Sequence, residues 1–161
     1  MKKTIMLLSL LLGAVLFAGT PTISRDALIK SEVETAVSML AAIQMKHLLG
    51  EMTQAQAKKL GADLLRELRY GDEGYFWADT DKGYNVVLYG RKDVEGTNRI
   101  DARDSDGVLY IREFLRLARD GGGFVEYRFP KLGEKTPVPK RSYVKPFKPF
   151  GWVIGSGYYK E

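Results

Sequence analysis

The spacing of apolar residues changes near residue 70, and this change constrains the fold more than any other feature of the sequence. Between residues 26 and 49, apolar side chains recur every three or four positions, which predicts an amphipathic helix. This face carries Val33, Ala36, Val37, Leu40 and Ile43. After residue 70 the sequence changes to short runs rich in aromatic and β-branched residues, which are typical of strands. The chain is therefore predicted to be helical in its first third and mostly β after it.

A second helix is expected between the first helix and the strands. Gly50 ends the first helix, and Thr53 is a residue type that often caps a helix N-terminus. The second helix is predicted to run until Tyr70-Gly71. Its apolar face is predicted to consist of Ala57, Leu60, Leu64 and Leu68.

Five strands and a third helix are expected in the rest of the chain. Strands at 74–79 and 85–89 form a hairpin around a turn at 79–83. The third helix follows a polar stretch, with Ser105 or Asp106 as its N-cap, and Gly121-Gly-Gly123 ends it. The remaining strands are expected at 124–129, 141–145 and 152–159. A loop is expected at 130–139.

This order of elements predicts an α+β domain with a five-stranded antiparallel sheet, in the PAS-like arrangement with a long N-terminal helix. A length of 161 residues is that of one domain. No internal repeat or linker is visible.

The first residues have the pattern of a secretory signal. Lys2 and Lys3 form a basic start, and an apolar run extends from Thr4 to Ala18. Cleavage after Ala18 is the preferred interpretation, and an uncleaved N-terminal anchor is the alternative. Either way residues 19–161 form the domain, and the expected location is the periplasm or another extracytoplasmic space.

Composition removes several kinds of chemistry. Cysteine is absent, which excludes thiol catalysis, disulfides and Cys-based zinc sites. His47 is the single histidine, so no His pair for a metal is present. The formal net charge is +5, or about +3 without Lys2 and Lys3, which is weak evidence for nucleic-acid binding. Residues 101–107 lack the ligand spacing of a calcium loop, and no helix follows 155–157 to receive a phosphate. Neither a metal nor a cofactor is predicted.

Five motifs, in order, resemble the single Cache domain, type 2, over about residues 26–160. They are Tyr70–Trp77, Glu95–Asn98, Gly121–Tyr127, Pro137–Lys145 and Phe150–Gly157. The resemblance implies extracytoplasmic sensing in bacterial chemoreceptors and sensor kinases, typically of small organic acids such as acetate, propionate, pyruvate or lactate. In those receptors the domain usually lies between two membrane helices. No second membrane helix follows here before Glu161, which favours a free or singly anchored binding protein.

Candidate ligand-binding residues follow from strand alternation and charge. Residues two apart share a strand face, so Tyr75 pairs with Trp77, and Tyr143 with Lys145. A small carboxylate needs cations and hydroxyl donors, which Arg91, Tyr143 and Lys145 offer. Tyr75 and Trp77 would form the wall against the apolar part of the ligand, and Tyr127 is a further candidate. For each of the six there is a structural alternative, either burial in the sheet core or exposure in a solvated loop. Trp152 is interpreted as structural.

Three functions compete on this evidence. The leading hypothesis is a non-catalytic exported protein that binds a small organic carboxylate and is read by a membrane chemoreceptor or sensor kinase. The alternative is a structural or interaction module without a ligand, which uses the N-terminal helix for homodimerisation or docking. An enzyme is the least favoured, because no nucleophile, metal cluster or cofactor loop is visible.

Overall fold

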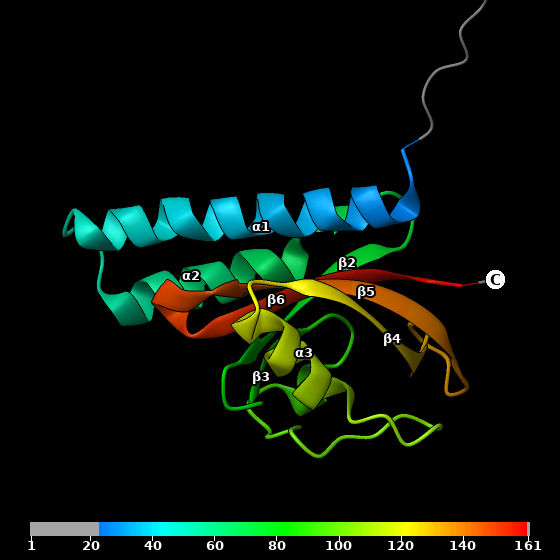
Figure 1. The fold of residues 1–161 in the computed structure, drawn as a ribbon. Coiled ribbons are helices and arrows are strands. Elements are labelled where there is room, and N and C mark those ends of the chain that lie inside the picture. Colours follow the sequence, from blue (N-terminus) through cyan, green and yellow to red (C-terminus); the bar gives the residue numbers. More distant parts are fainter. Residues whose placement is uncertain (1–22, 161) are drawn as a thin grey trace, which may run out of the picture.

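In a computed structural model, which describes residues 23–160, the chain begins with two helices that lie side by side. Helix α1 (Arg25–Leu48) is capped by Ser24, whose hydroxyl accepts a hydrogen bond from the Ala27 N–H. Helix α2 (Gln54–Glu67) begins at a capping box formed by Thr53 and Gln56. Figure 1 shows α1 running along one side of the molecule with α2 beside it.

A six-stranded antiparallel sheet follows the helices. Its strands are β1 (Arg69–Tyr70), β2 (Gly74–Thr80), β3 (Asn85–Leu88), β4 (Gly123–Pro130), β5 (Pro137–Phe147) and β6 (Trp152–Tyr159). The order across the sheet is β1-β2-β6-β5-β4, and β3 also pairs with β2. Strands β6 and β5 therefore lie at the centre of the sheet, between the β2–β3 hairpin on one side and β4 on the other. Short 3-10 helices, Lys92–Val94 and Lys148–Phe150, interrupt the connections.

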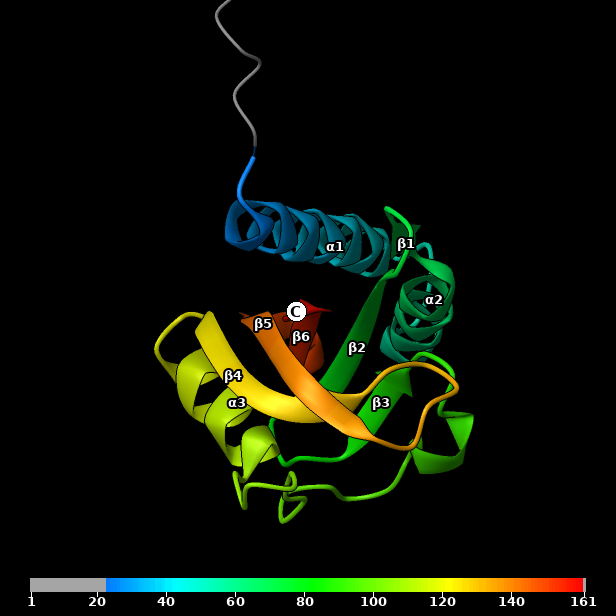
Figure 2. The same ribbon diagram turned by 90° about the vertical axis from the view of Figure 1, so that its right-hand side faces the viewer.

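Helices cover both faces of this sheet. Helices α1 and α2 lie on one face, and α3 (Tyr110–Arg119) lies on the other (Figure 2). Alternation along β2 shows the division, because Phe76 and Ala78 belong to the core beneath α1 and α2, whereas Tyr75 and Trp77 belong to the core beneath α3. The domain thus has two apolar cores, and any cavity between α3 and the sheet is separated from α1 by one layer of backbone.

The predicted α+β, PAS-like fold is confirmed, with small corrections. The sheet has a sixth strand, the two-residue β1, which the sequence pattern did not indicate. The apolar face of α2 is shifted: Ala57, Gly61 and Leu65 are its buried residues, and Leu64 is 40% exposed. Gly61 was missed because it has no apolar side chain, although α1 packs directly against it through Leu40.

The start of α3 and the β4–β5 connection also differ from expectation. Neither Ser105 nor Asp106 caps α3, because its N-cap is Leu109 and no side chain bonds there. The Asp104 carboxylate instead accepts hydrogen bonds from the backbone N–H groups of Val108 and Arg128, which ties this loop to β4. The expected loop at 130–139 shrinks to residues 131–136, since Pro130 pairs with Pro137 at the strand ends.

No helix within residues 23–160 is long and apolar enough to cross a membrane. The predicted signal segment, residues 1–18, lies outside the described residues. Within the described part of the chain, no group of three or more metal-ligating side chains is present.

Candidate ligand-binding site

A lysine lies inside the core between the sheet and α3. Lys140, near the start of β5, is 1% exposed, and its Nζ donates a hydrogen bond of 2.6 Å to the Tyr75 hydroxyl. Four aromatic rings surround the amine. Their centroids lie 4.3 Å (Tyr75), 4.9 Å (Tyr159), 5.0 Å (Trp77) and 5.4 Å (Phe129) from Nζ. Among residues 23–160, no carboxylate forms an ion pair with it.

This environment is costly for a positive charge. Burial lowers the pKa of Lys140 from 10.5 to about 7, because transfer of an ammonium group out of water disfavours its charged form. The aromatic faces offset part of this cost through cation–π attraction. An anion in contact with Nζ would restore the charged form more effectively.

The cavity beside Lys140 is small and mostly aromatic. Its lining consists of Tyr75, Trp77, Leu88, Arg99, Tyr110, Phe114, Tyr127, Phe129 and Lys140. It has a volume of about 10 Å³, near the minimum for one water molecule. The lining comes from β2, β3, β4, β5, α3 and the segment before α3, so only the folded chain assembles it.

Arg99 brings a second cation to the same cavity. It precedes α3, and its guanidinium donates a 2.8 Å hydrogen bond to the hydroxyl of Tyr110, the first residue of that helix. Asp79, at the end of β2, is fully buried, and burial raises its pKa to about 6 although Arg99 attracts the charged form. Arg99 therefore bonds the aromatic wall through Tyr110 and also attracts the buried Asp79 carboxylate.

Trp77 provides an unused donor near this wall. Its indole Nε1 is buried and has no hydrogen-bond partner within the described residues. The indole packs over Gly155 of β6, where a Cβ atom would overlap the ring. Glycine at this position therefore lets the tryptophan lie flat against the sheet. A buried N–H without a partner costs free energy, so a ligand acceptor there would be stabilised.

The structure brings three of the six predicted ligand residues together. Tyr75, Trp77 and Tyr127 all line the Lys140 cavity. Tyr127 stacks on Tyr110 with ring centroids 5.0 Å apart, and burial raises the pKa of its hydroxyl well above the usual range. These three residues also contribute to the core beneath α3, as the structural alternative expected, and their contact with a ligand stays a prediction.

The other three predicted residues lie elsewhere. Tyr143 and Lys145 share a face of β5, as expected, but it is the opposite face from Tyr75 and Trp77. Tyr143 packs on Phe124 in the core beneath α1, and Lys145 forms a 3.0 Å ion pair with Glu34 of α1. Arg91 is an exposed loop residue paired with Asp93 at 2.9 Å, and it lines a neighbouring hollow of about 260 Å³ that also includes Arg99. The structure does not join these three to the aromatic cavity.

Lys140 and Arg99 were missed for identifiable reasons. Lys140 follows Pro137-Val-Pro139, whose two prolines predict a loop, so the pattern predicts no strand face for Lys140. Extending the alternation back from Val144, a residue of the α3-side core, would have placed Lys140 on that side. For Arg99, within a polar loop, the sequence gives no such signal.

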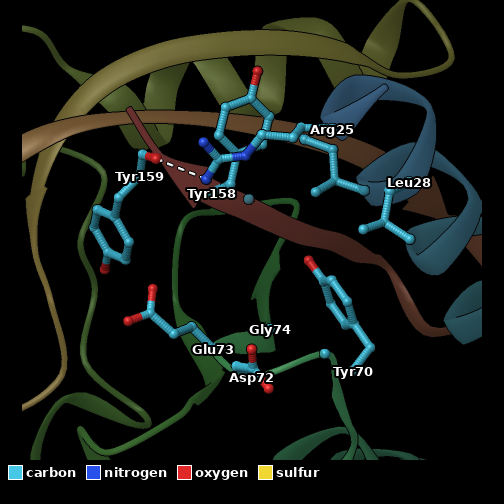
Figure 3. A pocket seen from close by; sticks show the side chains of 11 residues that line it. Arg25, Leu28, Tyr70, Asp72, Glu73, Gly74, Tyr158 and Tyr159 are labelled. Carbon is cyan, nitrogen blue, oxygen red and sulfur yellow. Dashed lines mark hydrogen bonds between the residues drawn. The ribbon is translucent and has the colours of Figure 1, made fainter. Parts of the chain in front are cut away.

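Of the larger hollows outside the cavity, two are lined in part by Tyr159. One, of about 160 Å³, lies between α1 and the β1–β2 turn (Figure 3). Its lining cation, Arg25, is already bonded to the Tyr159 carbonyl. The other, of about 280 Å³, lies beyond Tyr75 and Tyr159 and includes Arg69 and Lys131. Tyr75 and Tyr159, whose hydroxyls are 3.2 Å apart, separate this second hollow from Lys140.

Comparison with known proteins identifies the family. A model of the family described as "Single Cache domain 2" matches residues 22–161. The chain belongs to the single Cache domain family. The predicted resemblance is thereby confirmed.

Members and relatives of this Cache family include proteins of bacterial signalling. The chain is 37% identical over 131 residues to the methyl-accepting chemotaxis protein McpP of Pseudomonas putida, covering 80% of this chain and 24% of that protein. It is 32% identical over 122 residues to the sensor histidine kinase MctS of Rhizobium johnstonii, covering 76% and 26%. The chain thus spans about a quarter of the length of these curated relatives.

Solved Cache structures are also similar. A periplasmic sensor domain of a chemotaxis protein aligns with a TM-score of 0.83 and 35% identity, over 85% of this chain and 96% of that one. A Cache chemosensory domain studied for carboxylic acid recognition aligns with a TM-score of 0.81 and 32% identity, over 83% and 92%. The chain is therefore a Cache sensor domain related to those of chemoreceptors and sensor kinases.

Proposed function

We propose that this Cache domain is a non-catalytic sensor that binds one small organic carboxylate in the Lys140 cavity. The observation that carries the proposal is the buried amine of Lys140, which has a phenol hydroxyl and aromatic rings as neighbours but no carboxylate partner within residues 23–160. A buried cation of this kind is costly unless it is paired. A bound carboxylate would supply the missing partner.

The neighbouring groups suit the rest of such a ligand. Arg99 lines the same cavity and provides a guanidinium, the side chain best suited to a planar carboxylate. The unpartnered Trp77 N–H is a further donor, and the Tyr75 hydroxyl, which accepts the Lys140 hydrogen bond, orients the amine. Phe114 and Tyr110 would contact a short apolar chain. This mixture of an apolar wall and a few convergent polar groups is typical of small-molecule sites.

The cavity has a volume of about 10 Å³, so a ligand must be small and must displace side chains of the lining. Acetate, propionate, pyruvate and lactate are the proposed class, as the family resemblance implies. The solved Cache relative of known carboxylic acid recognition supports the same class. We place the domain outside the cytoplasm, like the periplasmic relative, with a membrane chemoreceptor or sensor kinase reading its ligand state.

Titration calorimetry of the purified chain with the four acids tests the proposal. At least one acid should bind, and Lys140→Met should abolish measurable binding because it removes the cation that pairs with the carboxylate. Lys145→Met is the matched control, since that lysine pairs with Glu34 on the other face, and it should bind like the wild type. Equal affinity in the Lys140→Met variant would refute the assignment of the site.

One observation favours a second candidate function. The cavity is almost filled by its own side chains, as expected for an interaction module that takes no small ligand. Such a module would dock or dimerise through α1. Absence of binding by all four acids to the folded wild-type chain would favour this alternative.

A further inference from the structure

Two neighbouring rows of side chains cross β4, β5 and β6 and point to opposite faces of the sheet. The site row consists of Tyr127, Lys140 and Tyr159, which are paired across the three strands. The clamp row, one residue along, consists of Glu126, Arg141 and Tyr158, which are paired in the same way. The site row faces α3, and the clamp row faces α1. Each residue of one row is covalently bonded to a residue of the other.

The clamp row holds the first turn of α1 through Asp26. Arg141 binds both carboxylate oxygens, with Nε 2.8 Å from Oδ1 and a terminal nitrogen 2.8 Å from Oδ2. The Tyr158 hydroxyl donates to Oδ1 at 2.9 Å. Arg141 also bonds Glu126 at 2.9 Å, which orients the guanidinium from the opposite side. The Arg141 hydrogen bonds hold the pKa of Asp26 below its usual range.

A second contact joins the same elements. Arg25 donates a 2.8 Å hydrogen bond to the backbone carbonyl of Tyr159, drawn in Figure 3, and its guanidinium lies 4.0 Å from the centroid of the Tyr158 ring. The start of α1 and the end of β6 therefore meet at one end of the molecule, as Figure 1 also shows. Asp26 and Arg25 attach this helix end to the residue pair Tyr158-Tyr159.

The site row has little freedom to admit a ligand without moving. Lys140 is in contact with Tyr75, and the Tyr159 hydroxyl bonds both Tyr75 and the carbonyl of Pro130. A cavity of about 10 Å³ is smaller than any carboxylate. Entry of a carboxylate therefore requires lining side chains such as Lys140 to shift, and Lys140 is bonded through the backbone to Arg141 of the clamp row.

We propose that occupancy of the Lys140 cavity and the docking of α1 through Asp26 oppose each other, so that a bound carboxylate loosens the first turn of α1. The clamp resists the shift that the ligand requires, and coupling of this kind acts equally in both directions. This inference rests on the proposed function of the cavity. It assigns Asp26, Arg141 and Tyr158 a positioning role, since none of them lines the site.

Propionate titrations of the full chain test whether weakening the α1 contacts changes the affinity of the Lys140 cavity. Asp26→Asn and Tyr158→Phe weaken the clamp and should raise propionate affinity, by at least about fivefold for Asp26→Asn and by less for Tyr158→Phe. Glu51→Gln is the matched control, because it breaks an exposed ion pair with Lys46 at the other end of α1 and should leave the affinity unchanged. Unchanged or lower affinity in Asp26→Asn would overturn the proposal.

Amide hydrogen exchange tests whether propionate binding loosens the first turn of α1. Saturating propionate should speed exchange at residues 27–30 of the wild-type chain, where the Leu28 N–H bonds the Ser24 carbonyl. In Asp26→Asn this ligand effect should be lost. Exchange there that is indifferent to propionate in the wild type would contradict the proposed coupling.

A ligand-free measurement separates failure of the coupling from failure of the proposed function. Weakening the clamp should loosen the site row and admit water, so the Lys140 amine in Asp26→Asn should titrate above its wild-type midpoint in NMR, whereas Glu51→Gln should not change it. If the wild-type chain binds none of the acids, the proposed function is wrong. The Lys140 titration still tests whether the Asp26 contacts are coupled to the Lys140 cavity, because it needs no ligand. An identical midpoint in wild type and Asp26→Asn would overturn the coupling.

Discussion

At the scale of single residues, Lys140 has the most unusual environment in the described part of the chain. A lysine at 1% exposure is rare unless it is paired, because its charged form loses hydration. Its neighbours, Tyr75 and the aromatic rings, stabilise it only in part. In the proposed function, the protonation of Lys140 and the affinity of the cavity for an anion are therefore linked.

This link predicts that carboxylate affinity depends on pH. The pKa of Lys140 is about 7 in the folded chain, and a bound carboxylate raises it, so binding takes up a proton above pH 7. Affinity should therefore fall as pH rises from 7 to 9, by up to about tenfold per pH unit. Calorimetry in buffers of different ionisation enthalpy would measure both affinity and proton uptake. Asp79, with its pKa near 6, is largely ionised throughout this range.

The same lysine makes the stability of the unliganded chain change with pH in a defined direction. Its folded pKa lies below the unfolded value of 10.5, so the unfolded state binds more protons between pH 7 and 10.5. The Lys140 contribution to the free energy of unfolding therefore increases with pH in this window. A pH-independent affinity would show that Lys140 does not pair with the carboxylate.

At the scale of elements, strand alternation decides which side chains meet. Strand β5 runs without interruption from Pro137 to Phe147, so Lys140 and Val144 face α3, whereas Arg141, Tyr143 and Lys145 face α1. The predicted strand began only at residue 141, and this boundary hid the one lysine that enters the cavity. Prolines at 137 and 139 suggested a loop, but both lie at the end of a hairpin, where proline is tolerated.

The capping box of α2 allows an element-scale test. Thr53 accepts a hydrogen bond from the Gln56 N–H at 3.2 Å, and the Gln56 side chain accepts one from the Thr53 N–H at 2.8 Å. Thr53→Ala should lower the free energy of unfolding by about 1 kcal/mol, because an N–H at the helix start loses its partner. Urea denaturation would measure this loss. Thr136→Ala, at an exposed position of the β4–β5 loop, is the control and should be nearly neutral.

At the scale of the whole molecule, the sheet separates two cores of different composition. The core beneath α1 and α2 consists of aliphatic and aromatic side chains, including Leu40, Phe150 and Trp152. The structural interpretation of Trp152 is thereby confirmed. The core beneath α3 holds the buried cation and its aromatic lining. A ligand on one side can influence α1 on the other only through the strands between them.

Ligand binding should therefore stabilise the whole folded domain. At a carboxylate concentration 100 times the dissociation constant, the free energy of unfolding should rise by about 2.7 kcal/mol. For a chain of this size this corresponds to an increase in Tm of about 5–10 °C. A thermal-shift series with the four acids would measure it, with Lys140→Met as the variant that should show no increase. An equal increase in that variant would indicate binding elsewhere.

The class of the fold and the family both follow from the linear sequence. Apolar spacing, the Thr53 cap and the glycine turns act between residues close in the chain, so a linear pattern carries them. The five motifs are likewise short runs of consecutive residues, and they indicate a Cache sensor. Tyr75, Trp77 and Tyr127 could be selected as candidates because strand alternation is itself a local property.

Which of these residues share a cavity depends instead on contacts between distant parts of the chain. Lys140 and Tyr75 are 65 positions apart, and Asp26 and Arg141 are 115 apart, so strand pairing and helix docking bring them together. The cost of burying a charge depends on everything around it, which no local pattern records. For this reason the sequence favoured Lys145, a lysine that the fold pairs with Glu34, and the structure revealed Lys140, a lysine with no carboxylate beside it in the described chain.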